Sequence, residues 1–174
     1  FLIKSGQNLK GVITVPGDKS ISHRSIILSS LAAGTSKITG LLEGEDCLAT
    51  IEVFRSMGIN IVKERGIYSV EGKGLKGLED PEKPLDFGNS GTSIRLCSGI
   101  LSAQSFESTL IGDSSLSSRP MQRIVEPLTA MGANITSKNG TLPIEISPTD
   151  SLKSINYSLP IASAQVKSCI MLSA

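Results

Sequence analysis

Apolar and polar side chains alternate with two different periods along the chain, and these periods predict helices and short strands in turn. Within residues 46–57 apolar side chains recur every three residues, as on one face of an amphipathic helix. They are Leu48, Ile51, Phe54 and Met57. Residues 22–33 carry mostly small and apolar side chains, which predicts a helix buried on most sides. Short apolar runs predict strands at residues 11–15, 36–41, 59–62 and 67–70.

Glycines and polar residues mark where these elements begin and end. Asp46 predicts the N-cap of the amphipathic helix, and Gly34 and Gly58 predict the ends of the two helices. The turn at residues 64–66 predicts a hairpin between the last two strands. Residues 72–84 hold three glycines, two prolines and several charges, which predicts a connector.

The same order of elements recurs later in the chain. Residues 57–61 (MGINI) resemble residues 131–135 (MGANI). Arg24, Arg95 and Lys167 each follow small polar residues and precede an apolar run. These markers define a unit of about 72 residues, with the order strand, helix, strand, helix, strand, strand.

The second copy carries its own turn and break signals. Residues 139–140 (Asn-Gly) predict a hairpin turn, and Pro127 predicts a kinked second helix or a shifted helix start. A loop at residues 147–151 leads into a third copy, which stops inside its first helix at Ala174. Because the chain also begins at Phe1 and not at a methionine, we expect it to be a piece of a longer protein.

Composition narrows the class of protein. Hydrophobic residues make up 39% of the 174 residues and aromatic residues 3%, which is enough for an aliphatic core. The net charge of +1 argues against nucleic-acid binding.

The three cysteines, Cys47, Cys97 and Cys169, lack metal-site spacing and predict buried thiols in a reducing compartment. No apolar run approaches about 18 residues, so no membrane span is expected. The expected location is the cytoplasm, or a plastid in a plant or alga.

Residues 17–24 (GDKSISHR) hold the strongest chemical signal in the chain. A helix that starts there presents unpaired backbone N–H groups beside Lys19 and Arg24, and such a start attracts anions. If the first helices of the units lie together inside the sheets, their starts converge, each with a cation. The sequence thus predicts a site for ligands that carry several negative charges.

Four motifs, taken in order, resemble one known family. They are residues 17–24, 88–92 (GNSGT), 119–121 (RPM) and 163–165 (SAQ). Together they resemble the 3-phosphoshikimate 1-carboxyvinyltransferase (EPSP synthase) family over essentially the whole chain. The resemblance implies a mixed α/β (α+β) fold, an inverse α/β barrel of repeated β-α-β-α-β-β units in a pseudo-threefold arrangement. Parallel helices are buried inside each domain and the sheets lie outside.

The resemblance also implies how the chain divides. Residues 1–17 would be a strand region of the other, missing domain, and residues 18–174 would form most of one three-unit domain. The units would span about 18–84, 85–152 and 153–174, the last of them truncated.

The implied reaction transfers the enolpyruvyl group of phosphoenolpyruvate to the 5-hydroxyl of shikimate 3-phosphate and releases phosphate. Lys19 is then the candidate catalytic residue, in contact with both substrates. The candidate residues for shikimate 3-phosphate are Lys19, Ser20, Arg24, Ser163, Ala164 and Gln165. Those for phosphoenolpyruvate are Lys19, Asn89, Gly91, Arg119 and Gln165.

Residue types add detail to this site. Without a Cβ, Gly91 would let the backbone approach a ligand closely. Arg119, between Ser118 and Pro120, is expected at a helix start.

His23 is expected to make a structural hydrogen bond and not to act as a base. No cofactor or metal is implied, because the chain has one histidine and no carboxylate cluster with ligand spacing. The full-length protein is expected to be a monomer.

Two other interpretations stay open. In the family an Asp general base and further charged residues lie on the other domain, so this chain alone is alternatively a binding module for shikimate 3-phosphate without turnover. A relative that transfers enolpyruvate to a UDP-sugar is disfavoured by the Lys-Ser-x-Ser-x-Arg run at residues 19–24. Leu96 and Ala164 stand where many members have Pro and Ser, and together with Gly91 they leave the response to glyphosate undecided.

Overall fold

The computed structural model describes residues 6, 8 and 10–174, and its elements fall into two successive units. The first unit holds α1 (Lys19–Leu31), β1 (Ala33–Thr39), α2 (Glu45–Ser56), β2 (Asn60–Glu64) and β3 (Ile67–Lys73). The second holds β4 (Leu85–Asp86), α3 (Gly91–Leu101), β5 (Ser108–Ile111), α4 (Ser114–Ser117), α5 (Gln122–Ala130), β6 (Asn134–Lys138) and β7 (Thr141–Ser147). A last helix, α6 (Ala164–Leu172), begins the third unit.

Each complete unit closes with the predicted hairpin. The turns at residues 65–66 and 139–140 have positive φ at both positions, as a tight two-residue turn between twisted strands requires. The first sheet has the order β1-β3-β2 and is antiparallel throughout. The second has the order β4-β5-β7-β6, with β4 parallel to β5. The second unit therefore shows the whole predicted order of strands and helices, with the short α4 added.

The helix boundaries differ from the predicted ones by a few residues. Helix α1 begins at Lys19 and not at Ser22, because the Asp18 carboxylate accepts a hydrogen bond from the Ile21 N–H at 2.8 Å and caps the helix. Helix α2 is capped by Gly44 and not by Asp46, which lies in the first turn. The predicted apolar face of α2 is buried except at Leu48, which is 39% exposed.

Two helix-end predictions have different outcomes. Gly34 does not end a helix, because α1 ends at Leu31 and Gly34 lies inside β1. Gly58 follows α2 with a φ of 82° and fits its predicted role as a stop. Pro127 lies within α5, which begins five residues earlier at Gln122.

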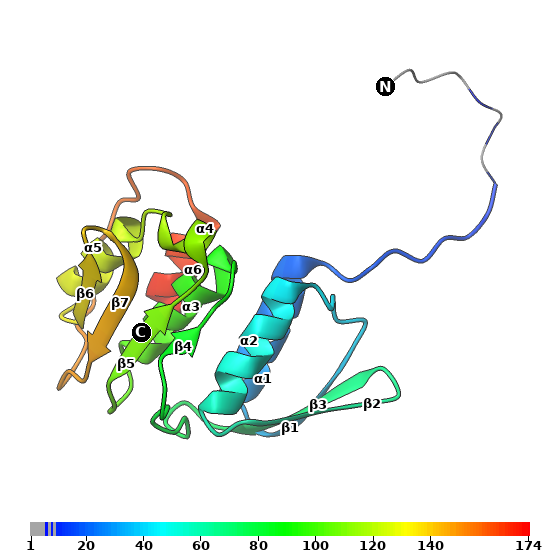
Figure 1. The fold of residues 1–174 in the computed structure, drawn as a ribbon, viewed down its shortest axis with the longest axis horizontal. Coiled ribbons are helices and arrows are strands. Elements are labelled where there is room, and N and C mark those ends of the chain that lie inside the picture. The colour runs from blue at the N-terminus through cyan, green and yellow to red at the C-terminus, as the bar shows by residue number, and fades with distance from the viewer. Residues whose placement is uncertain (1–5, 7, 9) are drawn as a thin grey trace.

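The strand predicted at residues 11–15 is wrong. The segment is described and forms no strand, and the side chains of Val12, Ile13 and Val15 are 100%, 85% and 71% exposed. It leads away from the body of the molecule, as the blue trace in Figure 1 shows. A strand forms only where a neighbouring strand takes its backbone hydrogen bonds, and none of the described strands pairs with this segment.

Helix α3 is the centre of the packing. Nine of its eleven residues are buried, and it contacts α1, α2, α5 and α6. Its Gly99 lies so close to the Cys169 carbonyl of α6 that the two helix backbones touch. In Figure 1, α1 and α2 lie along one face of the first sheet, while α3 and α6 lie behind the second. The mixed α/β class with outer sheets is confirmed, and α3 is buried. The prediction that the first helix is buried on most sides is wrong, because only six of the thirteen residues of α1 are buried and Leu28 is 55% exposed.

The three cysteines are buried, as predicted. Burial raises the pKa of the Cys97 thiol, and burial also raises that of Cys169, to about 12. Both thiols therefore stay protonated near neutral pH. Within the described residues no helix combines the length and the apolar character that crossing a membrane requires.

Candidate active site

The start of α3 brings two arginines together. Gly91 is the first residue of the helix and follows Ser90, whose hydroxyl accepts the Ser93 N–H and caps it. A Cβ on Gly91 would lie 2.8 Å from Arg95 Nη1 and 3.0 Å from Arg119 Nη1. Two guanidinium groups thus occupy the space that the missing side chain leaves. A place where two cations and a helix start meet favours an anion.

Arg119 reaches this place through a chain of polar contacts. Its Nη2 donates to Asn89 Oδ1, and Asn89 Nδ2 donates to Asp113 Oδ2 at 2.7 Å. Asp113 also accepts the Leu116 N–H at 2.7 Å, which caps α4. These hydrogen bonds, from the Leu116 N–H first and the Asn89 amide next, lower the pKa of Asp113 and keep it ionised. The carboxylate fixes Asn89 so that its amide oxygen faces Arg119.

The predicted helix start at Arg119 is wrong. Helix α4 ends at Ser117 and α5 begins at Gln122, so Arg119 lies in the link between them. The backbone N–H of Arg119 donates to the Leu116 carbonyl and continues the last turn of α4. The arginine is therefore held by a turn and by Asn89, and no helix dipole acts at its backbone.

The start of α6 meets the start of α3. Ser163 caps α6, because its hydroxyl accepts the Val166 N–H at 3.3 Å, and Ala164 is exposed beside it. Gln165 bridges the two helices: its Oε1 accepts from Arg95 Nη1 at 3.0 Å and its Nε2 donates to Thr92 Oγ1 at 3.0 Å. Burial lowers the pKa of Arg95, and the nearby charges of Arg119 and Arg123 lower it further.

The start of α1 holds the remaining candidates. Lys19 is half exposed and forms an ion pair with Asp46 of α2. Arg24 Nη1 donates to the Ser20 carbonyl at 3.2 Å, and its Nη2 reaches Ser168 Oγ on α6 at 2.9 Å. A hollow of about 380 Å³ lies beside Lys19 and Asp46.

The predicted convergence of helix starts is met in part: hydrogen bonds join the starts of α3 and α6, whereas α1 reaches α6 further along that helix. Arg24 of α1 and Arg95 of α3 both reach this helix, at Ser168 and Gln165. The third predicted cation, Lys167, lies exposed on α6. In the described part of the chain no single side chain accepts hydrogen bonds from both Lys19 and Arg119. The structure thus groups Asn89, Gly91, Arg119 and Gln165, and it places Lys19, Ser20 and Arg24 in a second group along α1.

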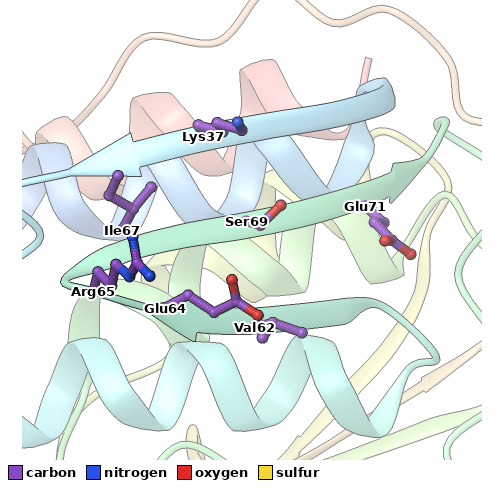
Figure 2. A pocket seen from close by; sticks show the side chains of 7 residues that line it. All are labelled: Lys37, Val62, Glu64, Arg65, Ile67, Ser69 and Glu71. Atoms are coloured by element: carbon purple, nitrogen blue, oxygen red, sulfur yellow. The ribbon is translucent and has the colours of Figure 1, made fainter.

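A larger hollow, of about 450 Å³, lies elsewhere, on the outer face of the first sheet (Figure 2). Its side chains come from β1, β2, β3 and the turn between the last two. They are Lys37, Val62, Glu64, Arg65, Ile67, Ser69 and Glu71. Charges of both signs alternate there, and the hollow faces away from the helices. Neither property favours a ligand of several negative charges, so we place the site at the helix starts.

His23 makes the structural hydrogen bond expected of it. It is fully buried, and its Nδ1 lies 2.8 Å from Thr50 Oγ1. Because the Thr50 hydroxyl donates to the Asp46 carbonyl, it accepts from His23, so Nδ1 carries the proton. Burial lowers the pKa of His23, and the charges of Lys19 and Arg24 act in the same direction, against an opposing effect of Asp46.

This burial predicts how stability depends on pH. Because the folded protein holds His23 neutral, the unfolded chain binds more protons below the ordinary histidine pKa of 6.5. The stabilisation is fully present above that pH and is lost as the pH falls through the lowered pKa of the folded state. We expect the free energy of unfolding of the full-length protein to fall more steeply from pH 7.5 to pH 5 than that of the variant His23→Gln. The free energies of unfolding are measured by urea denaturation at each pH. An equal fall with pH in the two proteins would contradict a neutral, buried imidazole.

Two glycines of α3 give a matched pair of variants. In Gly91→Ala the new methyl meets the ends of Arg95 and Arg119 and, in ordinary contact at 3.8 Å, the Leu116 side chain, whereas in Gly99→Ala it overlaps the Cys169 backbone. We expect Gly91→Ala to weaken the affinity of the full-length protein for an anion at this helix start about tenfold, and to change the free energy of unfolding by less than about 1 kcal/mol. Gly99→Ala should lower the free energy of unfolding by about 1–3 kcal/mol, because two helix backbones must separate. Titration with inorganic phosphate and denaturant unfolding of the full-length protein measure the two effects. A Gly91→Ala variant that loses stability but keeps its affinity for the anion would contradict this geometry.

Sequence reasoning missed several residues of the site. Asp46 was expected only as a helix cap, yet it pairs with Lys19. Thr92 and Asp113 orient Gln165 and Asn89, roles that depend on contacts across 73 and 24 residues. Arg95 had a visible signal, since it occupies the same place in the second unit as Arg24 in the first. The described residues hold no cluster of three His, Cys, Asp or Glu side chains placed to bind a metal ion.

Comparisons with known proteins show which family the chain resembles. The model of the family described as EPSP synthase (3-phosphoshikimate 1-carboxyvinyltransferase) matches residues 3–174. Two curated proteins named 3-phosphoshikimate 1-carboxyvinyltransferase align over 99% of this chain. The one from Hydrogenovibrio crunogenus is 55% identical, and the one from Ruthia magnifica is 56% identical. The chain covers 39% and 40% of their lengths, so it spans about two fifths of these relatives.

A solved structure extends the agreement to the fold. The structure of EPSP synthase from Acinetobacter baumannii superposes on 94% of this chain with a TM-score of 0.90 and 54% sequence identity. The chain covers 37% of that protein. Sequence and fold agree over nearly the whole chain, and so the chain belongs to the EPSP synthase (3-phosphoshikimate 1-carboxyvinyltransferase) family.

Proposed function

We propose that the full-length protein transfers the enolpyruvyl group of phosphoenolpyruvate to the 5-hydroxyl of shikimate 3-phosphate and releases phosphate. Membership of the family supports this activity, and so does the name that the curated relatives carry. One observation of the structure carries the proposal: Arg95 and Arg119 meet at Gly91, at a helix start. Both substrates are anions, and two guanidinium groups at a helix start stabilise bound anions.

In this proposal shikimate 3-phosphate binds along α1 and at the start of α6. Lys19, Ser20 and Arg24 lie on the first two turns of α1, and Arg24 already reaches across to α6. Ser163, Ala164 and Gln165 form the facing helix start. The phosphate would take its hydrogen bonds from Arg24 and from backbone N–H groups at the start of α6, where the capping group is the neutral hydroxyl of Ser163.

Phosphoenolpyruvate, in the same proposal, binds between α3 and the link that carries Arg119. Arg119 is held by Asn89, and Gln165 reaches the same place from α6. The guanidinium groups stabilise the carboxylate and phosphate of the substrate and the charge that develops as phosphate leaves. Lys19, which is half exposed and contacts both substrates in this proposal, donates or accepts the proton that the addition and elimination steps require.

We also propose the division into domains that the resemblance implied. Residues 18–174 form most of one three-unit domain, and the exposed segment before α1 belongs to the other domain. In the described units α2 contacts α1 and α3, and α5 contacts α3 and α6. By the same repeat, the rest of the third unit covers the groove between α6 and α1, which is lined by Ile27, Leu28 and Met171. A monomeric state and a cytoplasmic location remain part of the proposal; the compared relatives come from bacteria.

An assay of the full-length protein tests the function. Purified protein is mixed with phosphoenolpyruvate and shikimate 3-phosphate, and inorganic phosphate is measured as it is released. We expect one phosphate for each enolpyruvyl ether formed, and no release when shikimate 3-phosphate is omitted. No phosphate release, or release only with a UDP-sugar as acceptor, would overturn the proposal.

A further inference from the structure

We propose that Arg95 is a positioning residue, which holds three segments of the phosphoenolpyruvate site in place and sets the direction in which Gln165 donates. The inference rests on the proposed function, because it gives Arg95 a part in binding that substrate. Arg95 lies half-buried on the second turn of α3. It is not among the residues that the sequence predicts to bind either substrate.

The contacts of Arg95 reach three separate parts of the chain. Its Nη1 donates to the Gly91 carbonyl at 2.9 Å and to Gln165 Oε1 at 3.0 Å, and its Nη2 donates to the Pro120 carbonyl at 3.0 Å. These acceptors belong to the start of α3, the start of α6 and the link that follows Arg119. A planar guanidinium with a fixed fork suits such bridging, whereas the single ammonium of a lysine does not.

The contact with Gln165 has a chemical consequence for the ligand. Arginine only donates hydrogen bonds, so the amide oxygen of Gln165 must face Arg95. The amide nitrogen then points to Thr92, where one N–H donates to the hydroxyl. The second N–H is what Gln165 has left to offer a ligand, and a donor suits an anionic oxygen. Without Arg95 the amide is able to turn and present its oxygen, which would repel the same ligand.

The repeat gives an independent comparison. Arg24 occupies the equivalent place in the first unit, donates to the equivalent carbonyl four residues earlier, and also reaches α6. Arg24 has two acceptors from two segments, whereas Arg95 has three from three. More of the donor capacity of Arg24 therefore stays available for a ligand. The two arginines arise from one position of the repeat and have diverged into a binding role and a positioning role.

A double-mutant cycle in the full-length protein tests the assignment. Arg95→Lys keeps the charge and removes the fork, and Gln165→Ala removes the group on which Arg95 acts. We expect Arg95→Lys to lower kcat/KM for phosphoenolpyruvate about 10–100-fold in the native background and less than about threefold when Gln165 is already alanine. The control Arg123→Lys, an exposed residue of α5, should change neither background by more than about twofold. Equal losses in the two backgrounds would overturn the proposed action of Arg95 through Gln165, because the loss would then not depend on the Gln165 side chain.

A crystal structure of the full-length Arg95→Lys variant tests the role of Arg95 without relying on the transfer activity. If the native protein shows no transfer activity, the proposed function fails, and the position of Gln165 still decides the role of Arg95. We expect the Gln165 amide to leave Thr92 in the variant. An amide that keeps its place and its contact with Thr92 would overturn the positioning role, whatever the activity of the protein.

Discussion

We expect that, under the proposed function, replacing Arg119 with alanine in the full-length protein lowers kcat/KM for phosphoenolpyruvate by about 10²–10³-fold. In the structure this guanidinium is fixed by Asn89, which is held in turn by the ionised Asp113. It therefore arrives at the site already oriented, and the substrate does not have to order it. Removing such a preorganised donor costs the interaction with the bound anion and with the charge of the departing phosphate. Steady-state kinetics at saturating shikimate 3-phosphate measure the loss.

The matched control is Arg123→Ala. Arg123 carries the same charge and lies exposed on α5, a few residues further along the chain. Its loss changes the net charge equally and removes a charge that, like Arg119, acts on Arg95, so it separates the contact that Arg119 makes with Asn89 from the local positive field. We expect kcat/KM to stay within about threefold of the native value. Similar losses in Arg119→Ala and Arg123→Ala would mean that a diffuse positive field, and not a placed arginine, binds phosphoenolpyruvate.

We expect that, under the proposed function, replacing Lys19 with methionine lowers kcat of the full-length protein by about 10²–10⁴-fold, the usual range for loss of a positioned proton donor or acceptor. Methionine keeps most of the length of the side chain and removes the ammonium. Lys19 stands one residue after the cap of α1, beside the hollow at the start of α2, and its partner Asp46 holds it there. If Lys19 served only to attract substrate, the loss would fall on KM, and kcat at saturation would be kept.

Lys37→Met is the control for this prediction. Lys37 lies on the outer face of the first sheet (Figure 2), away from the helix starts. Its replacement removes the same charge from an exposed position, and we expect kcat within about twofold of the native value. A loss in Lys37→Met comparable to that in Lys19→Met would instead direct attention to the hollow on this sheet.

Much of the fold was predictable because its signals are local. The Asn-Gly turn at residues 139–140 and the glycine after α2 require backbone conformations that few other residues adopt, so each marks a fixed point in the chain. The absence of a strand at residues 11–15 was not predictable from local signals. The apolar side chains of this segment satisfy the pattern of a strand, but a strand also needs a partner, and the pattern of one segment does not say whether a partner is near.

The candidate site also combines features that the sequence predicts with contacts that only the fold creates. The motif at residues 17–24 identifies a helix start with cations, since capping and charge are properties of neighbouring residues. The links from Arg95 to Gln165 and from Asn89 to Asp113 join residues far apart in sequence, and only the fold brings them together. Gly91 shows both effects. Its lack of a side chain was expected to admit a ligand, and in the structure the same space accommodates two guanidinium groups.

A crystal structure of the full-length protein with shikimate 3-phosphate and phosphoenolpyruvate, or a non-reacting analogue of the latter, tests the account most directly. The central claim is that the anions bind where the starts of α1, α3 and α6 meet. We predict the phosphate of shikimate 3-phosphate on Arg24 and the start of α6, and phosphoenolpyruvate on Arg119 and the amide nitrogen of Gln165. Ligands bound in the hollow on the first sheet, or bound without contact to these residues, would contradict the claim.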